Sequence, residues 1–222
     1  MEQVLVAWSG GKDSAVALYQ VLKSQEYQVA ALLTTLTEDY DRISMHGIRR
    51  SLLERQAEVL GLPLEKVYIP KNASNDEYES NMRQALTKYK QAGVTSVVFG
   101  DIFLEDLREY REGNLAKLDM RGLFPLWKRD TRELVHSFIS LGFKAITACV
   151  DTHALDGRFV GRVIDEQFLT ELPDTVDPCG ENGEYHSFVY AGPIFKEPIP
   201  YTVGEIVLRE NRFCFCDLIP GG

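Results

Sequence analysis

The sequence predicts an α/β fold with a doubly wound, mostly parallel sheet, followed by a smaller, loop-rich C-terminal α+β subdomain. Short apolar runs alternate with helical patterns up to about residue 150. Strands that are apolar throughout are typical of a parallel sheet covered on both faces. The subdomain is indicated by a change of rhythm, because six of the nine prolines follow residue 151. We therefore expect one domain over residues 1–150 and a second over residues 151–222.

Each expected element of the first domain has a local signal. Strands are expected at the apolar or β-branched runs of residues 4–8, 29–36, 67–69, 97–99 and 145–150. A helix follows residue 14, where Ala15, Leu18 and Leu22 repeat with helical spacing. Further helices are expected at residues 48–60, at residues 75–89 with Asn75 as the N-cap, and at residues 104–117 and 131–138.

The C-terminal part has weaker helical periodicity. One helix is expected at residues 164–172, and residues 205–209 and 213–218 predict a β-hairpin that turns at Glu210 and Asn211. The four cysteines form no CxxC pair. Cys214 and Cys216 alternate with phenylalanines, a pattern that favours one face of a strand over a metal site.

Composition limits the classes of function. The chain of 222 residues carries 24 basic and 33 acidic side chains, a net charge of −9. Broad, non-specific binding to nucleic acid needs clustered cations, so nucleic acid is not an expected partner. No apolar run approaches the ~18 residues of a membrane span. We expect a soluble, reduced, cytoplasmic protein that has no membrane partner.

A glycine-containing segment, Ser9-Gly10-Gly11-Lys12-Asp13-Ser14, joins the first expected strand to the first helix. Parallel sheets bind ligands at this edge, glycines let the backbone approach an anion, and a helix N-terminus attracts negative charge. Lys12 adds a cation, and Asp13 indicates either Mg²⁺ or a helix cap. The segment is not a Walker A loop, because Asp13 follows Lys12 where that motif has Ser or Thr.

This segment resembles the PP-loop of the N-type ATP pyrophosphatases, enzymes of adenine nucleotide α-hydrolase-like fold that cleave ATP between its α and β phosphates. Three further segments resemble the diphthine–ammonia ligase family: Gly100-Asp101-Ile102, Pro125-Leu126-Trp127 and the ten residues from Asp177 to His186. The resemblance covers nearly the whole chain. One departure is that His186 follows Tyr185, where the family pattern has an acidic residue.

The resemblance implies ATP and Mg²⁺ as cofactors. The residues implied to bind the nucleotide are Ser9, Gly10, Gly11, Lys12, Asp13, Ser14, Thr34, Thr35, His46 and Gly100. Lys12, Asp13 and Asp101 are the implied catalytic residues, and Asp13 and Asp101 the implied metal ligands. Three of these assignments have plainer alternatives: Thr34 and Thr35 as ordinary strand residues, His46 as a surface histidine, and Asp101 as a ribose contact or helix cap.

Two groups of residues are implied to bind the substrate. On the expected helix at residues 104–117, Glu105, Arg108 and Arg111 share a face with Glu112 and form either an anion site or a solvated, salt-bridged surface. The glycine-rich segment at residues 180–186 is expected to be a loop that recognises a cationic substrate or a second magnesium ion, or else a plain acidic turn. Its implied substrate-binding residues are Glu181, Asn182, Glu184, Tyr185 and His186.

The activity implied is an ATP-dependent ligase that forms a C–N bond. It would adenylate a carboxylate, either diphthine of elongation factor 2 or a related acid, with release of pyrophosphate. Free ammonia would then displace AMP to give the amide. Two alternatives from other classes are a PP-loop enzyme that modifies tRNA and a module that senses ATP without turnover. The acidic charge and the lack of paired reactive cysteines disfavour the tRNA enzyme.

Overall fold

The first sheet is mostly parallel. In a computed structural model, which describes residues 1–37, 42–43 and 47–221, its parallel strands run in the order β4-β2-β1-β5-β6. The strands are β1 (Glu2–Ala7), β2 (Tyr27–Thr37), β4 (Leu64–Ile69), β5 (Ser96–Val98) and β6 (Arg121–Leu123), with the short β3 (Arg42–Ile43) antiparallel to the end of β2. After β1 the chain adds β2 and β4 on one side of it, and later β5 and β6 on the other side. This reversal of direction confirms the predicted doubly wound fold.

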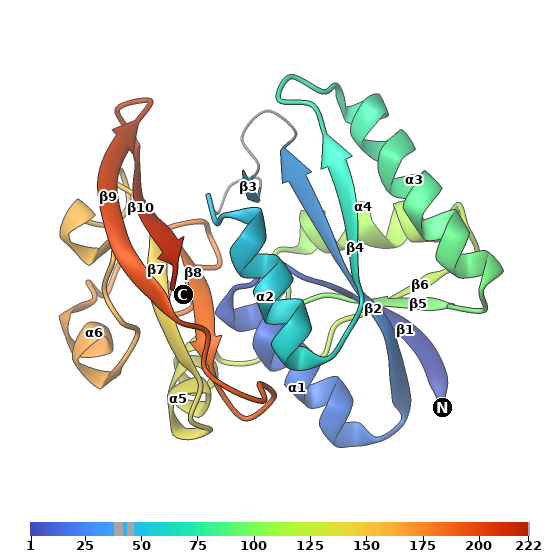
Figure 1. Cartoon of the computed structure of the whole chain (residues 1–222), viewed down its shortest axis with the longest axis horizontal. Helices are drawn as coiled ribbons and strands as arrows, with labels where there is room; N and C mark the ends of the chain where they lie inside the picture. Colours follow the sequence, from blue (N-terminus) through green and yellow to red (C-terminus); the bar gives the residue numbers. More distant parts are fainter. Residues whose placement is uncertain (38–41, 44–46, 222) are drawn as a thin grey trace.

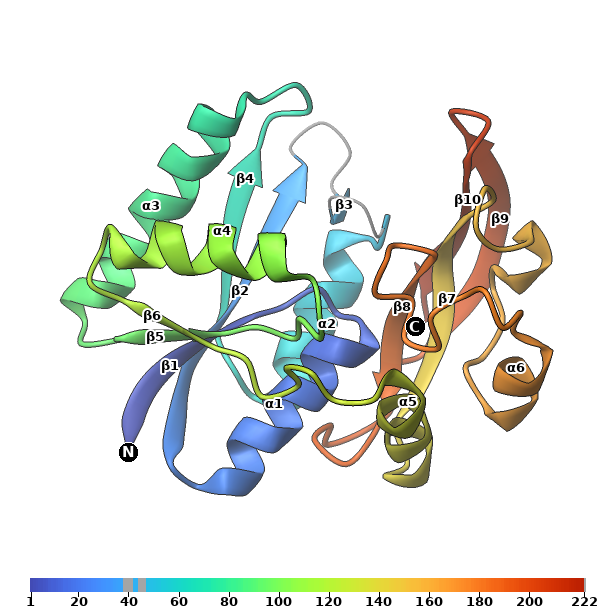
Figure 2. The same ribbon diagram turned by 180° about the vertical axis from the view of Figure 1, so that it is seen from behind.

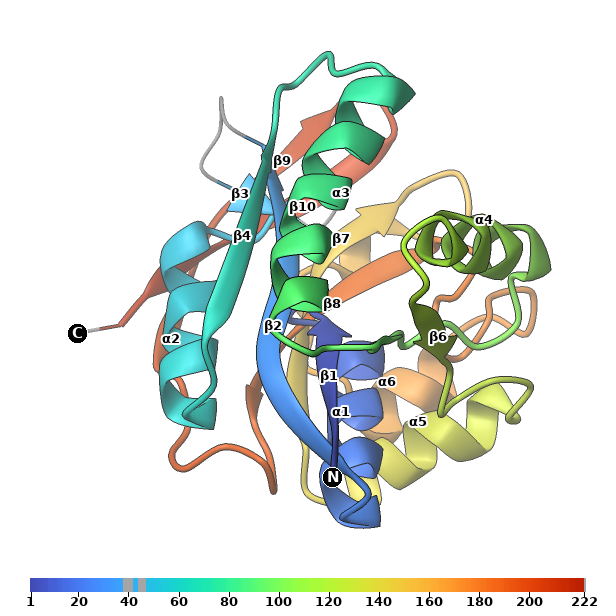
Figure 3. The same ribbon diagram turned by 90° about the vertical axis from the view of Figure 1, so that its right-hand side faces the viewer.

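Helices cover both faces of this sheet. Val4 and Val6 of β1 pack into a core with α1 (Lys12–Ser24) and α2 (Arg50–Leu60). Leu5 points the other way, into a core with α3 (Asn75–Gln91) and α4 (Glu105–Ala116). Figure 3 shows α2 and α3 on opposite sides of β4 and β2, and Figure 2 shows the face covered by α3 and α4. Within the described ranges, no helix is long and apolar enough to span a bilayer.

The second sheet is antiparallel, with strand order β8-β7-β10-β9 (Figure 1). Its strands are β7 (Lys144–Asp151), β8 (Tyr185–Ala191), β9 (Tyr201–Arg209) and β10 (Phe213–Pro220), accompanied by α5 (Thr131–Ser140), the 3₁₀ helix at Gly157–Phe159 and α6 (Glu166–Glu171). The predicted hairpin is present as β9 and β10. Glu210 and Asn211 at its turn have φ of 55° and 50°, as a tight hairpin turn requires.

Strands β3 and β6 were not expected from the sequence, and the structure differs from the expectations at three further places. The strand expected at residues 145–150 is β7, which pairs antiparallel with β8 and β10 instead of extending the parallel sheet. It is buried along almost its whole length, so its sequence has the unbroken apolar run of a parallel strand. Tyr185 and His186, expected in a loop, begin strand β8. Ser74, and not Asn75, caps α3 in a capping box with Glu77.

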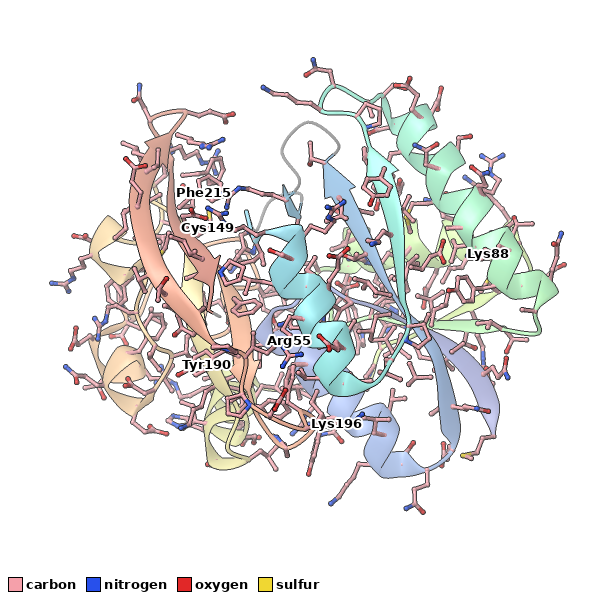
Figure 4. The ribbon with its side chains drawn as sticks, viewed as in Figure 1. Arg55, Lys88, Cys149, Tyr190, Lys196 and Phe215 are labelled. Carbon is pink, nitrogen blue, oxygen red and sulfur yellow. The ribbon has the colours of Figure 1, made fainter. Side chains whose placement is uncertain are left out.

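The division of the chain at residue 150 stays a prediction. The second sheet includes β7, which begins at Lys144. Helix α2 lies at the seam, the line of contact between the two sheets. There the backbone N–H of Lys196, from the loop between β8 and β9, donates to the carbonyl of Val59 in α2 at 3.2 Å. Figure 4 labels Arg55 and Lys196 on the two sides of this seam.

A cluster of charged side chains also joins the two sheets, near the N-terminal end of α2. Asp217 of β10 accepts hydrogen bonds from Arg42 at 2.9 Å and from Arg49 at 2.9 and 2.6 Å. These guanidinium groups, Arg49 foremost, lower the pKa of Asp217 from an ordinary 3.8 to about 2. Because Arg42 and Arg49 follow β2 and precede α2, this cluster joins the second sheet to the first.

We predict that Asp217→Asn lowers the free energy of unfolding at pH 7 by about 2 kcal/mol. The reason is that the ionised Asp217 carboxylate is more stable in the folded state than in the unfolded state. A carboxyl group with a lowered folded pKa stabilises the fold above its unfolded pKa. That contribution is lost as the pH falls through the folded value. Urea denaturation should therefore show the difference between the two proteins shrinking between about pH 4 and pH 2.

The exposed carboxylate Asp174 provides the matched control. Asp174→Asn should change stability by less than about 0.5 kcal/mol across the same pH range. An Asp217→Asn protein as stable as wild type at pH 7 would contradict the proposed joining role of this cluster.

Candidate active site

The segment at residues 9–14 lies where the strand order reverses. It leaves the carboxyl end of β1, whose neighbours are β2 on one side and β5 on the other. Gly100 and Asp101 follow the end of β5 and lie beside it. Open α/β sheets bind ligands at this position, because the loops that leave two adjacent strands separate there and open a crevice.

A buried glutamine, Gln56 of α2, holds the segment in place. Its Oε1 accepts from the indole N–H of Trp8 at 2.9 Å, and its Nε2 donates to the carbonyls of Gly10 at 3.0 Å and Val189 at 2.7 Å. The backbone N–H of Val189 also donates to Gly10 O at 2.9 Å. Gln56 was not among the site residues predicted from the sequence. The available signal was a polar residue on the apolar face of a predicted helix.

Two glycines are required by close packing. Gly10 has φ of 75°, and a Cβ there would lie 2.6 Å from Gln56 Oε1. A Cβ on Gly100 would lie 2.8 Å from the carbonyl carbon of Asp13 and 2.9 Å from the nitrogen of Ser14. Gly100 therefore allows the end of β5 to pack directly against the first turn of α1.

Lys12 is held on the side of the second sheet. Its backbone N–H donates to Ser187 Oγ of β8 at 3.1 Å. Its side chain is only 4% exposed, and Nζ donates to both oxygens of Asp13 at 2.9 and 2.8 Å and to the carbonyl of Cys179. Burial alone would lower the pKa of Lys12, but the charge and hydrogen bonds of Asp13 together with the nearby Tyr185 and Cys179 groups outweigh it, and the pKa is raised. The ammonium group therefore stays charged and links the loop to the segment before β8.

Asp101 is paired with Arg111 of α4. The guanidinium Nε lies 2.7 Å from Asp101 Oδ2, Nη2 lies 3.2 Å from Oδ1, and the guanidinium carbon lies 4.4 Å from the centre of the Phe99 ring. Burial raises the pKa of Asp101, and Arg111 opposes this effect. Burial likewise raises the pKa of Asp13 against the opposing charge of Lys12. Two carboxylates of the first domain, Asp13 and Asp101, thus face the crevice, each with a cation of its own.

The segment at residues 177–186 forms the opposite wall. Asp177 Oδ2 accepts from the backbone N–H of Cys179 at 3.1 Å and of Glu181 at 2.9 Å. The hydroxyl of Tyr185 donates to the carbonyl of Pro178 at 2.6 Å. Glu181 reaches across to the first domain, where its Oε1 accepts from the N–H groups of Ile102 at 2.7 Å and Phe103 at 3.4 Å.

Glu184 and Asn182 stabilise the turn itself. Glu184 Oε1 accepts from the N–H of Asp177 and from Asn182 Nδ2, both at 3.0 Å. His186 lies in the wall beside Ser187, and burial lowers its pKa to about 4. Its imidazole is therefore neutral near pH 7.

These walls enclose a cleft of about 560 Å³, within the ordinary range for ligand sites. Thirteen of the predicted site residues line it: Ser9, Gly11, Lys12, Asp13, Ser14, Thr34, Thr35, Gly100, Asp101, Arg111, Glu181, Tyr185 and His186. The structure places five others off the cleft: Gly10, Glu105, Arg108, Asn182 and Glu184. His46 lies outside the described residues. The functional roles of all these residues stay predictions.

Of the residues predicted to share a substrate-binding face of α4, only Arg111 lines the cleft. Glu105 is exposed and pairs with Lys128 at 3.0 Å. Arg108 pairs with Glu112 at 2.9 Å, and its guanidinium carbon lies 4.6 Å from the ring centres of Phe124 and Trp127. Arg111, the third member of this face, lines the cleft.

The carboxylates Asp13 and Asp101 are suited to bind magnesium only together with phosphate oxygens of a bound substrate. Within the described parts of the chain, no three His, Cys, Asp or Glu side chains come together as metal ligands. Mg²⁺ commonly binds through one or two carboxylates together with substrate phosphates, so Asp13 and Asp101 fit that mode. A divalent cation between them would also offset the burial that raises the pKa of each carboxyl group.

We predict that Gly100→Ala lowers the free energy of unfolding by about 1–3 kcal/mol, because its Cβ would press on the backbone of α1. Gly113 in α4 is the matched control, since a Cβ there meets nothing within 4 Å. Gly113→Ala should stabilise the helix by about 0.5–1 kcal/mol. Urea denaturation of both variants checks the pair, and equal stability of Gly100→Ala and wild type would contradict the packing argument.

Comparison with known proteins matches nearly the whole chain to the two domains of one family. A family model described as the diphthamide synthase N-terminal domain matches residues 2–121, and one described as the diphthamide synthase C-terminal domain matches residues 130–217.

Among curated relatives, the diphthine–ammonia ligase of Danio rerio is 29% identical over 91% of this chain and 88% of its own length. The Homo sapiens protein of the same name is 26% identical over 91% and 84%. The Schizosaccharomyces pombe one is 27% identical over 94% of this chain but 38% of its own length. By its match to both family models, the chain belongs to the diphthamide synthase family.

Proposed function

We propose that this protein is an ATP-dependent ligase that amidates a carboxylate, diphthine on elongation factor 2 or a related acid. The observation that carries the proposal is the position of the glycine segment at residues 9–14, at the reversal of strand order and opening into the cleft. The similarity to the diphthine–ammonia ligases of Danio rerio and Homo sapiens supports the reaction. An elongation factor works in the cytoplasm, where we place the reaction.

In this proposal the first domain, residues 1–150, binds ATP. Ser9, Gly11 and Ser14 line the part of the cleft at the start of α1, where a helix N-terminus favours phosphate. Thr34 and Thr35 would contact the adenine at the end of β2. The Thr34 hydroxyl supports this role, because it lines the cleft, is buried, and has no hydrogen-bond partner among the described residues.

Asp13 and Asp101 would hold Mg²⁺ together with the phosphates of the nucleotide. When bound there, the ion would neutralise the charge of the leaving pyrophosphate. Lys12 contributes a permanent positive charge beside the same phosphates, and Asp13 and the carbonyl of Cys179 hold its ammonium in position. Arg111 keeps Asp101 in place.

The second domain, residues 151–222, would recognise the acid. In the reaction, a carboxylate oxygen of the acid attacks the α phosphorus of ATP. Pyrophosphate leaves, and an acyl-adenylate forms. Free ammonia then displaces AMP and gives the amide. The wall at residues 177–186 would contact the acid through Glu181, Tyr185 and His186, while Asn182 and Glu184 hold the turn.

The decisive experiment incubates the protein with ATP, Mg²⁺, ammonium and elongation factor 2 bearing diphthine, and separates the nucleotides by chromatography. We expect AMP and pyrophosphate to form only when the acid is present, and the amide to form only when ammonium is added. Formation of ADP, or of AMP without dependence on an acid, would contradict the proposal.

We predict that Lys12→Ala lowers the rate of AMP formation by about 100-fold or more, the usual effect of removing one preorganised group that stabilises developing charge. Lys23, at the exposed C-terminal end of α1, gives a matched control. Lys23→Ala should keep the wild-type rate within about twofold, since surface substitutions change little. Equal rates for the two variants would remove Lys12 from the proposed chemistry.

A further inference from the structure

Three carboxylates face the cleft, and the structure distinguishes one of them by its partners. Both oxygens of Asp13 are bound by the ammonium of Lys12. Both oxygens of Asp101 lie against the guanidinium of Arg111. Each of these two carboxylates thus has a cationic partner, and its protonation would leave that cation unpaired in a buried site.

Glu181 has no such cation. Its Oε1 accepts two backbone N–H groups, from Ile102 and Phe103. Its Oε2 has no hydrogen bond or ion pair with any of the residues that the structure describes. The backbone of Glu181 is fixed by Asp177, whose carboxylate accepts its N–H at 2.9 Å. Glu181, which lines the cleft, is therefore fixed through its backbone and one carboxylate oxygen.

The proposed reaction needs a proton acceptor at this place. At neutral pH, dissolved ammonia is mostly ammonium, which has no lone pair and cannot attack a carbonyl carbon. Building on the function proposed above, we propose that Glu181 is the catalytic base that takes a proton from ammonium as its nitrogen attacks the activated carboxyl group.

The atoms balance as follows. Ammonium gives one proton to Glu181 Oε2, and the freed electron pair forms the C–N bond. The C–O bond to AMP breaks, and AMP leaves with that electron pair. The nitrogen then loses a second proton to solvent as the neutral amide forms.

The surroundings of Glu181 match this task. Burial raises its pKa to about 7, with Asp13 and Asp101 adding to the rise and Lys12 and the Ile102 N–H opposing it. A base is most effective when its pKa lies near the working pH. His186, in the same wall, has its pKa lowered by burial to about 4 and is a much weaker base. Glu184 lies off the cleft.

The test variant is Glu181→Gln. An amide oxygen can still accept the N–H of Ile102, so the loop keeps its anchor while the proton acceptor is lost. The two half-reactions are measured separately: exchange of labelled pyrophosphate into ATP in the presence of the acid, and formation of amide from the same acid with ammonium. Glu109, exposed on α4, supplies the control Glu109→Gln.

We expect Glu181→Gln to keep pyrophosphate exchange within about threefold of wild type and to lose amide formation by about 100-fold or more. Hydroxylamine, a nucleophile that is largely unprotonated at neutral pH, should restore product formation in the variant. Glu109→Gln should match wild type in every assay.

Three results would overturn the inference. In the first, Glu181→Gln forms amide at the wild-type rate. In the second, exchange and amidation fall equally, which would make Glu181 a residue that positions ATP or the acid. In the third, hydroxylamine gives no rescue. The proposed function is judged separately, because wild-type protein that shows no exchange refutes that function itself and with it the role of Glu181.

Discussion

The buried ammonium of Lys12 is the interaction on which the rest of the site depends. A charge that is 4% exposed is unstable unless it is paired and hydrogen-bonded, and here its partners come from both halves of the molecule. Asp13 belongs to α1, whereas the carbonyl of Cys179 belongs to the segment that leads into β8. The pairing therefore requires the second sheet to lie against the start of α1, and the cleft exists only because it does.

A second set of contacts makes that position specific. Gln56 uses both of its N–H donors on the carbonyls of Gly10 and Val189 and accepts from Trp8; these residues lie in the loop, in β8 and directly after β1. Each of these groups is buried, and an unpaired buried polar group costs about 1–3 kcal/mol. Few other placements of β8 would satisfy all of them. One glutamine on α2 thus determines how the wall of the cleft meets the loop.

The same geometry gives the three carboxylates of the cleft different chemistry. Lys12 and Arg111 each hold one carboxylate on both oxygens, whereas Glu181 is held by backbone N–H groups on one oxygen only. Identical functional groups thereby have different partners: two are paired with a cation, and among the described residues the third is not. In the mechanism that we propose, two of them serve charge neutralisation and the third serves proton transfer.

The sequence by itself determined the parallel sheet and the place of the loop, because both depend on local patterns: apolar runs, helical spacing, and two glycines before Lys12. It could not assign β7, since a central antiparallel strand buried along its length has the same composition as a parallel one. The sequence could not predict the partners of Arg111 and Glu181 either. Asp101 precedes Arg111 by ten residues, and Ile102 precedes Glu181 by 79. Only the tertiary structure brings these groups together, because pairing across such separations depends on how the sheets pack and not on the neighbours of each residue in the chain.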